Sequence, residues 1–162
     1  MYLPFEQMPA HARVWVYQAD RKFSPSEIDM VSQKLRAFCE QWNTHGKMMH
    51  TSFDIRFDQV VILAVDESHL DASGCSIDSS VRTLREIEQA LALNLLDQGK
   101  VSVLQEDTLE VNPLSAVKGK VESGILKADS TVLNPMVKSK ADLSDKWFIK
   151  ANESWLRKYF AN

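Results

Sequence analysis

The chain has 162 residues, of which 44% are hydrophobic and 25% charged, and its formal net charge is −3. This is the usage of an ordinary soluble globular protein with little Gly and Pro, and it argues against a disordered chain. The length predicts a single domain over residues 1–162, with a core at about 12–111 and an extension at about 112–162 packed on it.

The first predicted strand covers Arg13–Tyr17, which is rich in β-branched and aromatic residues. A helix then begins at Ser24, because Pro25 suits the first helical position and Glu27 completes a capping box with Ser24. One stripe of apolar residues at helical spacing predicts its buried face: Ile28, Val31, Leu35, Phe38 and Trp42.

Two further strands are predicted at 52–57 and 60–65, joined by a turn at Asp58-Gln59. In the first of them, Phe53, Ile55 and Phe57 alternate with polar residues and should share one face. The second is wholly apolar, which predicts a central strand covered on both faces, although a parallel α/β sheet would also fit this pattern.

A second long helix is predicted from Asp78, followed by a fourth strand at 101–104. The order β-α-β-β-α-β predicts an α+β fold with a ferredoxin-like core and an antiparallel sheet. Beyond it we expect short strands at 108–111 and 131–133, a short helix at 113–121, and a helical, aromatic C-terminal extension. One face of a terminal helix should bury four residues of that extension: Trp155, Leu156, Tyr159 and Phe160.

The candidate site is the turn between the apolar strand and the second helix, at 73–80. A helix start offers free N–H groups and a positive dipole end, which favour an anion or a thiolate. The candidate ligand-binding residues are Gly74, Cys75, Ser76, Asp78 and Ser79. Acidic neighbours disfavour both the thiolate and the anion, so we favour a capped helix start in which Asp78 supplies the cap or a first-turn charge.

Catalytic and cofactor signatures are otherwise missing from the sequence. No spacing commits a histidine to Cys75, and neither HExxH nor paired CxxC motifs occur, so we expect no metal and no cofactor. There is no GxxxxGK followed by Ser or Thr and no LSGGQ-like segment, so the chain is predicted not to be a P-loop ATPase.

The cysteine count, the N-terminal residues, the apolar runs and the basic residues bear on cellular location and partners. Cys39 and Cys75 are too few for a disulfide scaffold, the N-terminus lacks signal-peptide character, and no apolar run approaches the roughly 20 residues of a membrane span. We therefore expect a soluble, cytoplasmic protein without membrane insertion. The basic residues of the C-terminal half are scattered, which predicts no nucleic-acid partner.

Three segments carry a resemblance to a known family: 13–20 (Arg-Val-Trp-Val-Tyr-Gln-Ala-Asp), 65–68 (Val-Asp-Glu-Ser) and 72–78 (Ala-Ser-Gly-Cys-Ser-Ile-Asp). Through them the chain resembles, over most of its length, a family of small bacterial proteins often labelled ABC transporter ATPase. The resemblance implies a bacterial source and brings no catalytic residues to carry over.

Together these features predict a non-catalytic α+β module that binds a partner protein or a small ligand. Docking of the aromatic extension between two copies would make it a homodimer. The alternative is a thiol-dependent enzyme or redox sensor that uses Cys75 at a helix N-terminus.

Overall fold

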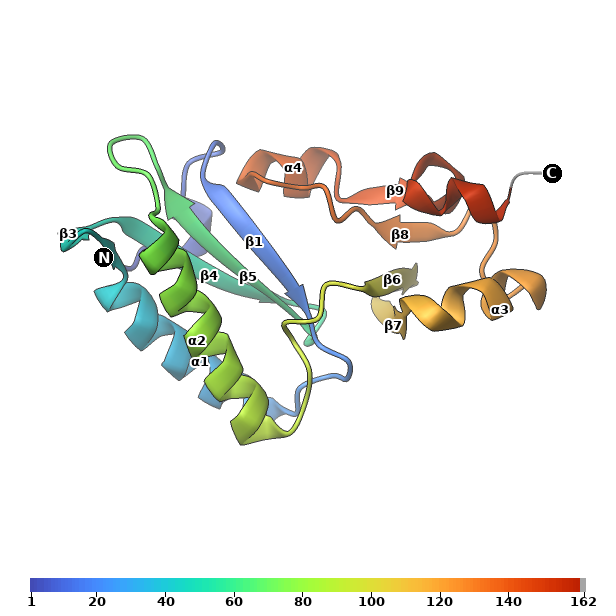
Figure 1. The fold of residues 1–162 in the computed structure, drawn as a ribbon, viewed down its shortest axis with the longest axis horizontal. Helices are drawn as coiled ribbons and strands as arrows, with labels where there is room; N and C mark the ends of the chain where they lie inside the picture. Colours follow the sequence, from blue (N-terminus) through green and yellow to red (C-terminus); the bar gives the residue numbers. More distant parts are fainter. Residues whose placement is uncertain (161–162) are drawn as a thin grey trace.

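The computed structural model describes residues 1–160 and shows a mixed α+β protein with two larger antiparallel sheets and one short sheet of two strands (Figure 1). The first sheet has the strand order β1-β5-β4, with β1 at Arg13–Gln18, β4 at His50–Arg56 and β5 at Val60–Asp66. The long helices α1 (Pro25–Gln41) and α2 (Gly74–Leu91) cover one face of this sheet.

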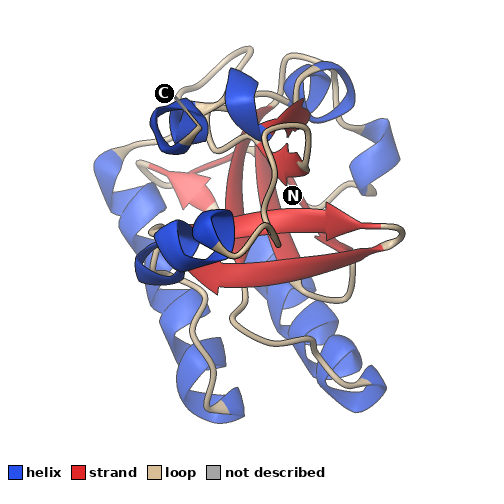
Figure 2. Ribbon diagram, turned by 90° about the vertical axis from the view of Figure 1, so that its right-hand side faces the viewer, coloured by secondary structure: helices blue, strands red, loops and turns tan. Residues whose placement is uncertain are grey.

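The second sheet has the strand order β7-β6-β8-β9. Its strands are β6 (Lys100–Gln105), β7 (Thr108–Pro113), β8 (Thr131–Leu133) and β9 (Phe148–Lys150). In Figure 2 strands of this sheet lie in front of the first sheet and cross it. The shorter elements are β2 (Asn43–Thr44), β3 (Lys47–Met48), α3 (Val117–Glu122), α4 (Lys140–Asp145) and 3-10 helices at Phe5–Gln7, Leu114–Ala116, Ala151–Glu153 and Trp155–Tyr159.

The two sheets meet in a shared apolar layer. On the helix side of the first sheet, Val61, Leu63 and Val65 of β5 pack with α1 and α2. On its other side, Val60, Ile62 and Ala64 of β5 pack with Leu133, Val137 and Trp147 of the C-terminal half. Every residue of Val60–Val65 is fully buried, which confirms the central strand covered on both faces.

The α+β class is confirmed, but the complete ferredoxin-like strand order is not. Strands β1, β5 and β4 have the arrangement expected of a β-α-β-β unit. The fourth expected strand, β6, pairs with β7 and β8 in the second sheet instead. Among the described residues β1 therefore has a strand neighbour on one side only, apart from one bridge between Arg13 and Ser139.

The expected turn at Asp58-Gln59 is wrong by one residue. Phe57 and Asp58 are the central residues, with φ of 58° and 54°, and the N–H of Gln59 donates to the carbonyl of Arg56 at 3.0 Å. Positive φ at both central residues is the pattern of a type I′ turn, and residues 57–59 separate Arg56 of β4 from its partner Val60 of β5. The turn places the Phe57 side chain on the opposite side of the sheet from Phe53 and Ile55. There the Phe57 ring packs against Trp147.

The aromatic extension differs from its expected form because its chain pairs as a strand before it turns helical. Phe148 lies in β9, and Trp155–Tyr159 is a 3-10 helix. Leu156 is fully buried, as expected, and Tyr159 and Phe160 are partly buried. Trp155 is 40% exposed, so the prediction that it is buried is wrong.

No helix within residues 1–160 combines the length and apolar character needed to cross a membrane.

The start of α1 carries the predicted capping box, in which Glu27 accepts from the N–H of Ser24 and Ser24 Oγ accepts from the N–H of Glu27. Arg21 also donates to both Glu27 oxygens, at 2.8 and 2.9 Å, and to the carbonyl of Leu91 at the end of α2. The hydrogen bond from Arg21, aided by that from Ser24, lowers the pKa of Glu27 from 4.5 to about 2.

We expect this carboxylate to make the fold acid-sensitive. Because its pKa is lower in the folded chain, its contribution to stability is present above pH 4.5 and is lost as pH falls towards about 2. Glu27→Gln should reduce the loss of unfolding free energy across that pH window, as measured by urea unfolding at a series of pH values. An identical acid dependence in wild type and variant would contradict the assignment.

Candidate functional site

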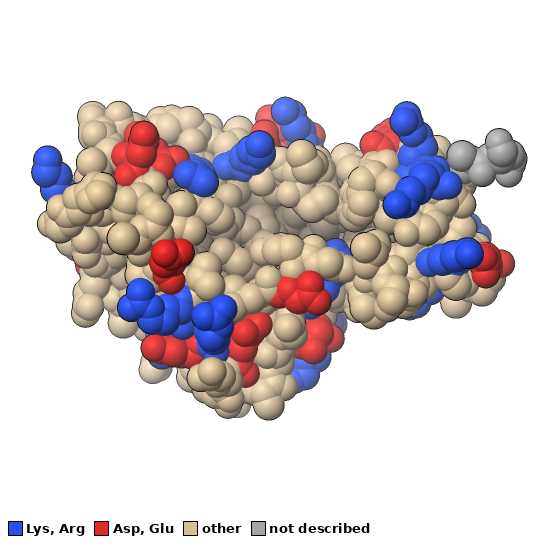
Figure 3. Space-filling view, in the orientation of Figure 1, with Lys and Arg blue, Asp and Glu red and all other residues tan. Residues whose placement is uncertain are grey.

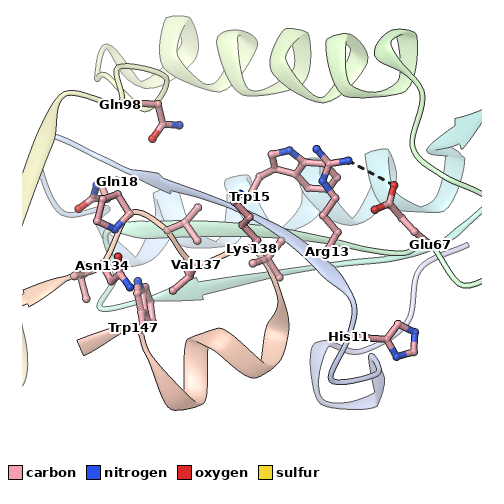
Figure 4. A pocket seen from close by; sticks show the side chains of 14 residues that line it. His11, Arg13, Trp15, Gln18, Glu67, Gln98, Asn134, Val137, Lys138 and Trp147 are labelled. Carbon is pink, nitrogen blue, oxygen red and sulfur yellow. Dashed lines mark ion pairs between the residues drawn. The ribbon is translucent and has the colours of Figure 1, made fainter. Parts of the chain in front are cut away.

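A cleft lies between the free side of β1 and the chain that follows β8. Its volume is about 770 Å³, within the range typical of ligand sites. Figure 3 shows the hollow from the face seen in Figure 1, and Figure 4 shows the side chains that line it. They come from β1, from the loop after β5 and from the segment 133–138 together with Trp147.

One wall is a stacked pair on the helix side of β1. The Arg13 guanidinium lies over the Trp15 ring, 4.6 Å from its centroid. Arg13 also pairs with Glu67 across 3.6 Å, as the dashed line in Figure 4 marks. The Trp15 ring packs against the buried Trp42 ring, with centroids 5.8 Å apart. This contact with the core fixes the position of the wall.

The opposite wall is apolar and belongs to the second sheet. Leu133, Val137 and Trp147 line it, and each is at least nine-tenths buried. The N–H of Asn134 donates to the carbonyl of Trp147 at 2.7 Å, and its side-chain amide donates to the carbonyl of Lys146. These bonds fix the path of the segment that leaves β8.

A lysine at the start of β6, Lys100, contacts the end of β1 at Gln18. The Lys100 ammonium donates to the carbonyl of Gln18 at 2.7 Å and to both oxygens of Asn94. Burial lowers its pKa. The Ser102 hydroxyl also donates to the Gln18 side chain. These bonds join the start of β6, a strand of the second sheet, to the end of β1.

At the other end of β1, His11, Asp66 and Ser68 lie together without forming a catalytic triad. His11 Nε2 is 2.7 Å from Ser68 Oγ and 3.3 Å from Asp66 Oδ1. A triad needs the carboxylate on the ring nitrogen that does not face the serine, whereas here both contacts use one nitrogen. Asp66 accepts hydrogen bonds from the Ser68 hydroxyl and N–H, and these bonds lower the pKa of its carboxyl. The same bonds stabilise the turn that follows β5.

The predicted candidate turn is the first part of α2, because the helix begins at Gly74 and not near Asp78. Ser76 is buried, its hydroxyl donates to the carbonyl of Ser73, and its own carbonyl accepts from the Trp42 indole at 2.8 Å. The Ser79 hydroxyl donates to the carbonyl of Ser76. These hydroxyls are therefore engaged within the helix.

The remaining candidates lie on the surface of the same turn. Gly74, Cys75 and Asp78 are exposed, and no hydrogen bond reaches the Cys75 sulfur from residues 1–160. The cap is Ser73, whose hydroxyl accepts from the N–H of Ser76 at 3.1 Å, so the assignment of the cap to Asp78 is wrong. Ser73 was not predicted as the cap, because the apolar stripe of the helix begins only after Asp78 whereas the helix itself begins at Gly74.

We expect Ser73→Ala to lower the unfolding free energy by about 0.5–2 kcal/mol, because the first turn loses its side-chain acceptor. Asp78→Ala, at an exposed position beyond that turn, should change it by about 0.5 kcal/mol or less. Urea unfolding of the two variants gives the comparison. A larger cost for Asp78→Ala would show that its carboxylate supports the helix start.

The two cysteines occupy different environments. Cys39 is fully buried in α1, and burial raises its pKa to about 12, so this thiol is unreactive near neutral pH. Within residues 1–160 no group of three or more His, Cys, Asp or Glu side chains is placed to hold a metal ion.

Comparison with known proteins gives no relative from which a site could be carried over. No protein-family model, no curated protein and no solved structure matches the chain. The site must therefore be judged on its own geometry, and the cleft is where the two sheets bring distant residues together. The sequence pointed to the strand that supplies one wall but not to the cleft, because Trp147 and Val137 reach β1 only through tertiary packing.

Proposed function

We propose that this protein is a non-catalytic binding module and that its binding site is the cleft beside β1, with a partner protein segment or a small ligand as its occupant. The observation that carries the proposal is the free side of β1 facing a cleft of about 770 Å³. An unpaired strand edge is a surface that proteins usually cover, and here it lies inside a concave site.

The polar groups around the cleft support binding over catalysis. Arg13 is paired with Glu67, and His11 is 65% exposed and engaged with Ser68 and Asp66. General acid–base or nucleophilic chemistry would need a base oriented towards a nucleophile, and these contacts do not provide one. The thiol alternative rests on Cys75 alone, at the exposed start of α2 and outside the residues that line the cleft.

Ligand screening by NMR tests the assignment of the site. We expect hits from mixtures of small molecules and short peptides to shift the resonances of Gln18, Asn134 and the Trp147 indole. Gln98→Trp, an exposed position at the cleft rim, should abolish these shifts. Gln33→Trp is the matched control on the exposed side of α1 and should leave them unchanged. Hits that leave the cleft resonances unmoved, or that are equally affected by both variants, would contradict the proposal.

We further propose that the core is a ferredoxin-like unit whose fourth strand has moved to the second sheet. The order β1-β5-β4 and the position of β6 directly after α2 support this reading. A bacterial source stays the expectation from the resemblance, and a cytoplasmic location stays the expectation from the sequence, supported by two free cysteines. The homodimer also stays a proposal, supported by exposed apolar side chains in the C-terminal half: Met136, Phe148 and Trp155.

A further inference from the structure

We propose that the occupant of the cleft is an extended peptide segment of a partner protein, which adds to β1 as one more strand. This inference rests on the proposed binding function and specifies its ligand. It follows from the direction of the β1 backbone groups, from the way the chain's own segment leaves them open, and from the two walls that flank them.

The backbone of β1 alternates between its two sides. The backbone N–H and C=O groups of Arg13, Trp15 and Tyr17 point towards β5. The N–H of Val14 points the other way and donates to the carbonyl of Lys138 at 3.0 Å. Val16 and Gln18 share that outward direction because alternate residues of a strand use the same edge. The carbonyl of Gln18 accepts from Lys100. Within residues 1–160, the N–H and C=O of Val16 and the N–H of Gln18 have no hydrogen-bond partner.

The chain's own segment begins to pair with this edge and then leaves it. The N–H of Lys140 donates to the carbonyl of Ala12 at 2.9 Å, which together with the Val14 bond forms one antiparallel bridge. The N–H of Lys138 instead donates to Asp142 Oδ2. Beyond it, Met136 donates to the Asn134 side chain, and Pro135 has no N–H to give. The bridge ends there, and the open groups of β1 face the cleft.

The walls suit a strand whose side chains alternate. One set of side chains would face Trp15 and Gln98, and the other would face Val137 and Trp147. The side chains that line the second wall are apolar, so we expect an apolar residue at alternate positions of the peptide. The open groups of β1 are main-chain groups of alternate residues, which is the pattern that an added strand pairs with.

A random heptapeptide library displayed on phage provides the probe. Peptides enriched on the wild-type protein are synthesised, and their binding is mapped by NMR and by hydrogen exchange. We expect bound peptide to slow exchange of the Val16 and Gln18 amides. N-methylation of the peptide amides that face β1 should abolish binding, whereas N-methylation of the alternate amides should leave it intact.

A protein variant gives the same test from the other side. Val16→Pro removes the outward N–H at an edge position where proline is tolerated, and Val16→Thr is the control that keeps it. The proline variant should weaken binding about 2- to 10-fold, the value of one hydrogen bond. Peptides that bind in the cleft regardless of N-methylation pattern would overturn the strand inference while leaving the cleft as the site. A selection that yields no cleft-binding peptide would also overturn it, and small-molecule hits in the cleft would then sustain the broader proposal alone.

Discussion

Trp147→Ala should lower the unfolding free energy by about 3–5 kcal/mol, the cost typical of deleting a buried tryptophan side chain. Trp147 is 2% exposed and stands where the second sheet packs on the first. Its ring lies 6.0 Å from that of Phe57 at the β4–β5 turn. The positive φ of Phe57 is a conformation that a bulky residue rarely adopts, and this contact helps to hold it.

The neighbouring residue gives a matched control. Phe148 is also aromatic and lies next in the chain, but it is 46% exposed. Phe148→Ala should therefore cost much less in urea unfolding than Trp147→Ala. Equal costs for the two substitutions would show that the contact between the sheets does not contribute as described.

Trp42→Ala should have a similar effect, about 3–5 kcal/mol, on the helix side of the first sheet. The Trp42 ring is 2% exposed, packs against Phe38 with centroids 4.9 Å apart, and donates its indole N–H to the carbonyl of Ser76 at 2.8 Å. Trp42→Phe keeps an aromatic ring and loses the hydrogen bond, which is worth about 0.5–1.5 kcal/mol.

Trp155→Ala is the control for a tryptophan that is 40% exposed, and urea unfolding should show a small change. If Trp42→Ala cost no more than Trp155→Ala, the first turn of α2 would not be anchored through Trp42.

Local signals in the sequence were enough to place most elements of the first sheet. The capping box at Ser24 starts α1 where expected, and the apolar run of β5 lies at the centre of its sheet. These features depend on residues close together in the chain, or on the burial of both faces of one strand. Their hydrogen bonds and apolar patterns can be recognised without knowing the rest of the fold.

The sheet to which β6 belongs could not be predicted in the same way. Its apolar residues suit either sheet, and the choice depends on distant contacts such as that between Lys100 and Gln18. The turn at Phe57 escaped prediction because phenylalanine is unusual at a positive φ and is held there by Trp147. The cleft could not be foreseen either, because it exists only once β6 has left the edge of β1 open.

The central claim is that β1 has a free edge, and amide hydrogen exchange of the protein without ligand tests it most directly. We expect the amides of Trp15 and Tyr17, which are bonded to β5, to exchange slowly. The amides of Val16 and Gln18 should exchange faster by orders of magnitude, although they alternate with the slow ones in the same strand. Uniformly slow exchange from Trp15 to Gln18 would contradict the account, because it would mean that another strand already occupies the edge.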